Sequence, residues 1–230
     1  CTAEEAIKAI PSGSRVVTGH AVGEPSYILD VLCDHKDDYK DVEIVHMVSM
    51  GAARYCGEDM AGHFRHNSLF VGGTTRKAVE EGRADYTPCF FYQVPALFDK
   101  ELPVDVALIT VTPPNENGKV SLGVSVDYTL AAVKHAKTVI AQVNDQMPFT
   151  YGDAVIDVSE IDYFVEHSAP LIELPPAKLT DIEKEIGANC ASLIQDGDTL
   201  QLGIGAIPDA VLFYLKDKKE LGIHSEMISD

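Results

Sequence analysis

Apolar positions in the first part of the chain alternate between helical spacing and short continuous runs. Residues 2–13 pair Thr2 with Glu5, the spacing of a helix N-terminal capping box, and their apolar positions recur at helical intervals up to Pro11. Residues 15–25 form an apolar run that leads into glycine-rich sequence, which predicts a buried strand followed by a loop. We therefore expect the fold to open with a short helix and a strand.

The next two segments complete a βαβ unit. Residues 26–35 have the spacing of an amphipathic helix, and residues 41–50 predict a second strand. Strand, glycine loop, helix and strand in this order predict parallel strands that are covered by helices. The predicted fold class is α/β, with an open, largely parallel sheet that has helices on both faces.

The middle of the chain continues the same alternation. Residues 104–112 are a continuous apolar run, as in a central strand that is covered on both faces. In the same manner, residues 68–73 precede the helix-like residues 74–82 as a strand would, and residues 129–136 and 137–144 predict another helix and strand. Proline-rich residues 173–179 interrupt the pattern and predict a linker, because proline neither donates to a ladder nor fits inside a helix.

After the linker, the chain repeats the order of its first part. Helix, strand, glycine turn, helix and strand recur in residues 186–195, 196–208, 209–217 and 221–227. We therefore expect one domain over residues 1–175, then a linker and the truncated start of a second, similar domain over residues 176–230. Any two βαβ units share this order, so the pattern alone leaves a true duplication open.

The charge of the chain limits the classes of partner. Its 230 residues include 36 acidic and 18 basic side chains, a formal net charge of −18, and no basic run. Nucleic acids are not expected partners, because their binding depends on Lys and Arg that neutralise phosphates. Backbone N–H groups at a helix start bind anions without net positive charge, so an anionic small molecule remains compatible.

Cysteine usage and hydropathy indicate the compartment. Five cysteines without a CxxC pair argue against a disulfide framework and a zinc site. Neither a signal-peptide pattern nor a membrane-length apolar stretch is present, so we expect a cytoplasmic protein. His63 and His66 lie three residues apart, but no cysteine or carboxylate completes a ligand set, so no metal is predicted. The chain starts at Cys1 and ends in mid-pattern, which suggests part of a longer product.

A glycine turn in the second copy is the first candidate for chemistry. Gly203, Ile204 and Gly205, with Pro208 at a helix start, present backbone N–H groups that can stabilise an oxyanion or phosphate. The turn lacks GxGxxG spacing and a ribose-binding acidic residue, so no dinucleotide site is predicted. A tight turn with no ligand is the alternative interpretation.

Two side chains at strand ends are further candidates. Glu226 follows the next predicted strand, at the carboxyl end where open α/β sheets bind ligands. It can act as a base or nucleophile, or it is a solvated strand end. His20, in the equivalent glycine loop of the first copy, is either a polar pocket residue or an ordinary loop side chain.

Several strings taken together resemble the acetyl-CoA hydrolase/transferase family. They occupy residues 43–51, 70–91, 103–114, 124–129, 142–148, 190–211 and 221–230. Within the family, the chain is most similar to the N-terminal portion of the 4-hydroxybutyrate and butyrate:acetate CoA-transferases. The resemblance implies two similar α/β domains, of the kind also found in ribose-5-phosphate isomerase and glucosamine-6-phosphate deaminase.

The resemblance also implies residue roles. Glu226, in a His-Ser-Glu-Met string, would attack an acyl-CoA and form a glutamyl-CoA thioester through an acyl-glutamyl anhydride. The backbone N–H groups of Ile204 and Gly205 match the oxyanion hole of the family. The substrate-pocket candidates are His20, Asn144 and Gln146.

The implied activity is a ping-pong CoA-transferase. It would move CoA between 4-hydroxybutyryl-, butyryl- or acetyl-CoA and a small carboxylic acid such as acetate, with CoA as a substrate and no separate cofactor. The chain without the rest of the second domain is expected to be inactive, and the whole protein is expected to form a homo-oligomer. The alternatives are an acetyl-CoA hydrolase, a noncatalytic acyl-CoA-binding module and, on fold alone, a sugar-phosphate isomerase.

Overall fold

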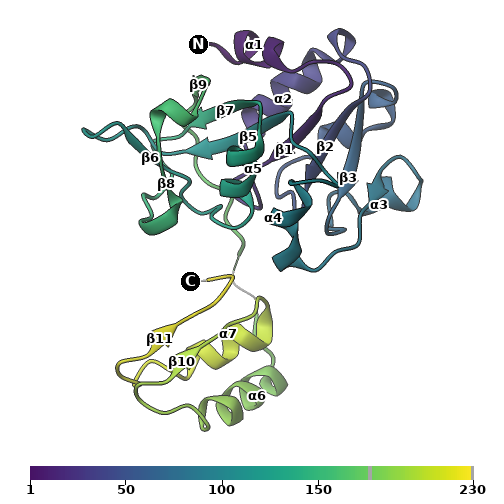
Figure 1. The fold of residues 1–230 in the computed structure, drawn as a ribbon. Coiled ribbons are helices and arrows are strands. Elements are labelled where there is room, and N and C mark those ends of the chain that lie inside the picture. Colours follow the sequence, from purple (N-terminus) through teal and green to yellow (C-terminus); the bar gives the residue numbers. More distant parts are fainter. Residues whose placement is uncertain (176–177, 229–230) are drawn as a thin grey trace. The chain divides into compact units, whose positions relative to one another are not determined.

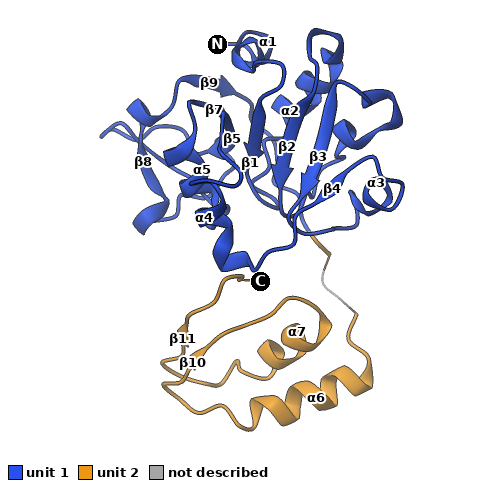
Figure 2. Ribbon diagram, turned by 45° about the vertical axis from the view of Figure 1, so that its right-hand side comes forward, with its two compact units in different colours: residues 1–173 blue, residues 174–230 orange. Residues whose placement is uncertain are grey.

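A computed structural model describes residues 1–175 and 178–228 of the chain (Figure 1). The chain divides into two compact units, residues 1–173 and 174–230 (Figure 2), so the division lies two residues before the predicted boundary. No helix in the described ranges is long and apolar enough to cross a membrane.

The first unit is built on a seven-stranded sheet of order β4-β3-β2-β1-β5-β7-β9, and every neighbouring pair of strands is parallel. Its strands are β1 (Arg15–Thr18), β2 (Val42–His46), β3 (Phe64–Ser68), β4 (Asp85–Tyr86), β5 (Val106–Val111), β7 (Thr138–Val143) and β9 (Tyr163–Glu166). A separate antiparallel pair consists of β6 (Lys119–Ser121) and β8 (Val155–Asp157). The parallel sheet confirms the predicted α/β class.

Helices cover both faces of this sheet (Figure 1). They are α1 (Ala3–Ala6), α2 (Ser26–Asp34), α3 (Arg76–Glu80), α4 (Val94–Leu97) and α5 (Thr129–His135). Successive strand residues point to opposite faces, so Leu108 of β5 packs in the core beneath α1 and α2, whereas Ile109 packs beneath α4 and α5. All six residues of β5 are buried, which explains its uninterrupted apolar sequence.

One strand position was predicted wrongly. The apolar residues 68–73 suggested a strand there, but β3 spans Phe64–Ser68 and is followed by a loop. Its sequence is polar, although four of its five residues are buried. Asn67 illustrates how the strand tolerates this, because its Nδ2 donates to Glu43 Oε1 at 2.8 Å and its Oδ1 accepts from the Thr87 hydroxyl at 2.8 Å.

Within residues 178–228, the second unit has two helices and two short strands. They are α6 (Asp181–Ala191), β10 (Thr199–Leu200), α7 (Ala206–Phe213) and β11 (Gly222–Ile223), and the strands pair in parallel. The two helices pack so closely that there is no room for a side chain at Gly187 of α6. A Cβ atom placed there would lie 2.7 Å from the carbonyl of Ala210 in α7. The order is the one that the sequence predicts.

Equivalent hydrogen bonds occur at the strand starts of both units. The N–H of Gly13 donates to the Lys40 carbonyl at 2.8 Å, and the N–H of Gly197 donates to the Lys219 carbonyl at 2.9 Å. Each lysine is followed by a residue with positive φ, Asp41 (54°) and Glu220 (56°). Such a conformation is uncommon for residues other than glycine, so its recurrence supports an internal repeat.

Capping and strand register agree with this correspondence. The predicted capping box at Thr2 is present, and a second one begins α6, where Thr180 Oγ1 accepts from the Glu183 N–H and Glu183 Oε2 accepts from the Thr180 N–H. The registers match as well, with Arg15 opposite Glu43 in one unit and Thr199 opposite Gly222 in the other. That the second unit begins a complete second domain stays a prediction.

Candidate active site

The carboxyl ends of the parallel strands in unit 1 define one edge of its sheet, which is where α/β sheets bind ligands. At this edge β1 leads into Gly19 and His20, and β7 leads directly into Asn144. His20 is 7% exposed and Asn144 is 2% exposed, so neither is an ordinary surface side chain. The structure thus places two of the predicted pocket residues at the same sheet edge.

His20 is held in place by one hydrogen bond to its ring, one to its backbone and two aromatic contacts. Nδ1 forms a hydrogen bond with the Asp127 carboxylate, and the backbone N–H of His20 donates to Ser125 Oγ at 2.8 Å. The ring stacks on Tyr128 at 5.6 Å between centroids and meets the Phe91 ring edge-on at 5.7 Å. Because Nδ1 is bound to Asp127, Nε2 is the nitrogen left to meet another molecule.

The glycine-rich loop after β1 approaches the segment of Asp127 very closely. A Cβ atom on Gly23 would lie 2.4 Å from the Cβ of Ser125, closer than two side chains can come. Gly23 is therefore needed for the hydrogen bond between His20 and Ser125 to form. Sequence reasoning missed Asp127, since 107 residues separate it from His20.

Glu24 is a buried carboxyl group in the same loop. It is 6% exposed, and burial raises its pKa because the charged form loses its hydration. A Cβ on Gly51 would lie 2.7 Å from Glu24 Oε1, so this carboxyl group packs against the loop that follows β2. No sequence pattern pointed to Glu24, because its burial depends on that distant loop.

Asn144 and Gln146 contact the backbone and side chains of a neighbouring segment. Asn144 Nδ2 donates to the Ala169 carbonyl at 2.8 Å, and its Oδ1 accepts from the Gln146 and Ala169 N–H groups. Gln146 is exposed, and its Nε2 donates to Ser168 Oγ at 3.1 Å. The polar groups of Asn144 are thus already bonded within the protein, which favours a structural role over a substrate contact.

In unit 2, the glycine turn lies between β10 and α7. Gly205 caps α7 with φ of 119° and ψ of −178°, a conformation that is essentially restricted to glycine. Ile204 is 61% exposed, and in the described ranges the N–H groups of Ile204 and Gly205 have no protein acceptor. Two free N–H groups beside a helix N-terminus can stabilise a negatively charged oxygen.

Glu226 follows β11, the strand that pairs with β10, and its side chain is exposed. The residue before it, Ser225, bonds the residue before the glycine turn: its Oγ donates to the Leu202 carbonyl at 2.9 Å and accepts from the Leu202 N–H at 3.1 Å. Adjacent parallel strands lie about 4.8 Å apart. The glutamate and the glycine turn therefore leave neighbouring strands at the same level.

Of the two histidines that were considered as metal ligands, His63 directly precedes β3 and His66 lies within it. Nδ1 of His63 bonds the Tyr39 carbonyl, and Nδ1 of His66 bonds the Ile44 carbonyl, both at 2.9 Å. In residues 1–175 and 178–228 there is no group of three or more His, Cys, Asp or Glu side chains that could hold a metal ion.

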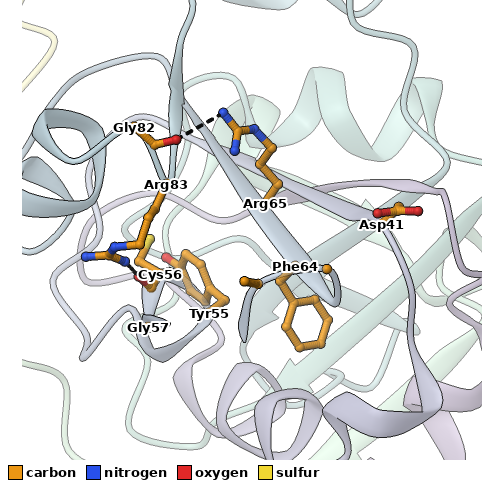
Figure 3. Close-up of a pocket in the computed structure, with 10 residues that line it drawn as sticks. Asp41, Tyr55, Cys56, Gly57, Phe64, Arg65, Gly82 and Arg83 are labelled. Carbon is orange, nitrogen blue, oxygen red and sulfur yellow. Dashed lines mark hydrogen bonds between the residues drawn. The ribbon is translucent and has the colours of Figure 1, made fainter. Parts of the chain in front are cut away.

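A cavity of about 320 Å³ lies elsewhere in unit 1 (Figure 3). Asp41, before β2, and Phe64 and Arg65, at the start of β3, line it, so it lies at the amino ends of these strands, away from His20. Two arginines face it, but the Arg65 guanidinium binds Asp85 and the Arg83 guanidinium binds Glu81. With both cations already paired, this cavity is a poor site for an anionic acyl-CoA.

Comparison with known proteins shows the family of the chain. Residues 1–174 match the model of the acetyl-CoA hydrolase/transferase N-terminal domain. The chain belongs to this family. It is 64% identical to 4-hydroxybutyrate coenzyme A transferase of Clostridium kluyveri, over all of this chain and 54% of that protein. It is 44% identical to succinyl-CoA:acetate/propanoyl-CoA:succinate CoA transferase of Fasciola hepatica, over 99% of this chain and 48% of that protein.

The fold comparison gives the same result. The crystal structure of 4-hydroxybutyrate CoA-transferase from Porphyromonas gingivalis matches all of this chain and 54% of its own, with a TM-score of 0.86 and 40% identity. This member of the acetyl-CoA hydrolase/transferase family spans about half the length of the curated relatives it matches. The family resemblance predicted from the sequence is confirmed.

Proposed function

We propose that this chain supplies the nucleophile and the oxyanion-binding turn of a CoA-transferase that acts on small acyl groups. The observation that carries the proposal is the position of Glu226, which leaves β11 at the level where the Gly203–Gly205 turn leaves β10. Glu226 is exposed, and among the described residues the N–H groups of Ile204 and Gly205 on the neighbouring strand have no protein acceptor, which supports the proposal. The names of the similar proteins support the reaction class.

The reaction balances with Glu226 as the only protein group that changes bonding. Its carboxylate attacks the acyl-CoA carbonyl, and the C–S bond breaks. This releases CoA as a thiolate and forms an acyl-glutamyl anhydride. The thiolate then attacks the glutamyl carbonyl, which releases the first acid and forms a glutamyl-CoA thioester. An acceptor carboxylate reverses both steps, so the CoA leaves on the acceptor acid and Glu226 is regenerated.

Each step passes through a tetrahedral oxyanion, and the N–H groups of Ile204 and Gly205 are proposed to bind it. Donors fixed at a helix start stabilise this charge without reorganising during the reaction. We propose separately that His20 binds a substrate carboxylate or terminal hydroxyl through Nε2, since Asp127 fixes its ring. Small acids such as 4-hydroxybutyrate, butyrate and acetate are the proposed substrates.

The active protein is proposed to have the length of its relatives, because this chain covers about half of them. CoA is proposed as a substrate that is held covalently for part of the cycle, with no separate cofactor, and a homo-oligomer is the proposed assembly. A cytoplasmic location is proposed because the sequence has an odd number of cysteines, five, and no CxxC pair. Burial raises the pKa of Cys33 and Cys56 to about 12, so neither forms a reactive thiolate at neutral pH.

The test is the intact mass of the protein, at the length of its relatives, after brief mixing with butyryl-CoA. A CoA-sized adduct should form on the peptide that contains Glu226 and should be discharged by acetate. Glu226→Ala should form none, whereas Glu185→Ala, which removes an exposed glutamate on α6, should behave as the parent. Acyl exchange without an adduct, or discharge by water with no need for an acid, would contradict the proposal.

A further inference from the structure

Beyond the backbone hydrogen bonds that pair β10 with β11, a side chain continues to link the two strands. The backbone ladder runs from the Gly222 N–H to the Asp198 carbonyl and from the His224 N–H to the Leu200 carbonyl, each at 2.9 Å. The next link is the Ser225 hydroxyl, which bonds both the carbonyl and the N–H of Leu202. One hydroxyl therefore satisfies both backbone polar groups of that residue.

This link matters because of the residues that come next on each strand. Leu202 is the last residue before the Gly203–Gly205 turn, whose glycines leave the backbone unusually free to rotate. Ser225 is the last residue before Glu226. The two hydrogen bonds of the Ser225 hydroxyl thus join the strands directly before the proposed oxyanion-binding turn on one strand and directly before Glu226 on the other.

In the first unit, a different side chain forms hydrogen bonds to the equivalent strand ends. Counting from the matched strand registers, Thr18 corresponds to Leu202 and Met47 to Glu226. There the Tyr128 hydroxyl donates to the Thr18 carbonyl at 3.1 Å and accepts from the Met47 N–H at 3.3 Å. A hydroxyl thus holds this carbonyl in both units, but only in unit 2 does it come from the residue beside the proposed nucleophile.

We infer that Ser225 is a positioning residue for the transfer reaction. Its hydroxyl holds the strand of Glu226 against the strand of the oxyanion-binding turn, so that carboxylate and N–H groups keep a reactive spacing. The inference rests on the proposed function. Misplacing a nucleophile by about 1 Å is enough to cost on the order of 10²-fold in rate, so the effect is measurable.

The experiment compares Ser225→Ala and Ser225→Thr in the protein at the length of its relatives. Single-turnover formation of the CoA adduct on Glu226 with butyryl-CoA should slow about 10-fold to 100-fold in Ser225→Ala, with KM for butyryl-CoA changed less than about 3-fold. Ser225→Thr keeps a hydroxyl and should recover most of the rate. The matched control is Ser192→Ala, which removes a hydroxyl that donates to the Asn189 carbonyl at 2.7 Å in the same unit and should leave the rate unchanged.

The outcomes separate this inference from the proposed function. If the parent forms the adduct and Ser225→Ala forms it equally fast, the positioning role is wrong and the transferase proposal stands. The role is also wrong if Ser225→Thr is as slow as Ser225→Ala, or if the loss lies in KM alone. If the parent forms no adduct on Glu226, both proposals fall together.

Discussion

The imidazole rings of His46 and His66 stack in the core of unit 1, with their centroids 4.2 Å apart. Both side chains are almost fully buried, and Nε2 of His46 lies 2.6 Å from the Tyr55 hydroxyl. Burial lowers the pKa of both rings, that of His66 to about 4, because a charged imidazole there would lose its hydration. The pair is therefore held neutral in the folded protein.

Acid should destabilise the fold through this pair. Between pH 6.5 and about 4 these rings bind more protons in the unfolded chain than in the folded one, so their contribution to the free energy of unfolding falls as the pH falls. The shift of His66 alone corresponds to about 3 kcal/mol. Urea unfolding from about pH 7.5 to about pH 4.5 should show this slope, and His66→Gln should flatten it. His63→Gln is the control, and an unchanged slope in His66→Gln would show that other groups cause the pH dependence.

Gly205→Ala should impair both the turn and the chemistry. An alanine with φ of 119° and ψ of −178° has a strained backbone, at a cost of roughly 1–3 kcal/mol. The backbone would relieve that strain by shifting, and the shift would move the N–H groups of the turn. Loss of an oxyanion donor costs on the order of 10²-fold, so adduct formation on Glu226 should slow by a similar factor. Gly73→Ala is the matched control, because its Cβ would meet no atom within 4 Å. A full rate in Gly205→Ala would refute the oxyanion assignment.

Asp127→Asn tests the proposed role of His20. The carboxylate orients the ring through Nδ1, so its loss should raise KM for the acceptor acid about 10-fold, the equivalent of one charged hydrogen bond. Steady-state kinetics with acetate as the varied substrate measures this. Asp153→Asn, at an exposed position, should have no effect. If KM for acetate stays the same in Asp127→Asn, His20 does not bind the acid.

Gly187→Ala should loosen unit 2. The added methyl group would lie 2.7 Å from the backbone of Ala210, so α6 must move away from α7, at a cost of about 1–3 kcal/mol. Hydrogen exchange should accelerate in both helices and stay unchanged in the sheet of unit 1. Glu185→Ala, at an exposed position of α6, serves as the control. Unchanged exchange in α7 would mean that the helices tolerate a wider separation.

The order of elements was predictable because local chemistry specifies it. Thr2 and Glu5 form the capping box that their spacing predicts, and the apolar run at residues 104–112 contains the central strand β5. Periodicity and turn residues act over a few neighbours, so these signals are present in the sequence itself. The strand β3 was misplaced for the same reason, since its polar residues are buried through partners far along the chain.

The candidate site was predictable only in part. The sequence by itself proposed Glu226, Ile204, Gly205 and His20 as candidates, because strand ends and glycine turns mark ligand-binding edges and because their strings resemble a known family. Only the tertiary structure brought Asp127 to His20 across 107 residues, and Ser225 to Leu202 across 23. The physical reason is that a hydrogen bond between distant segments depends on the register of strands and the approach of loops, which no local pattern encodes.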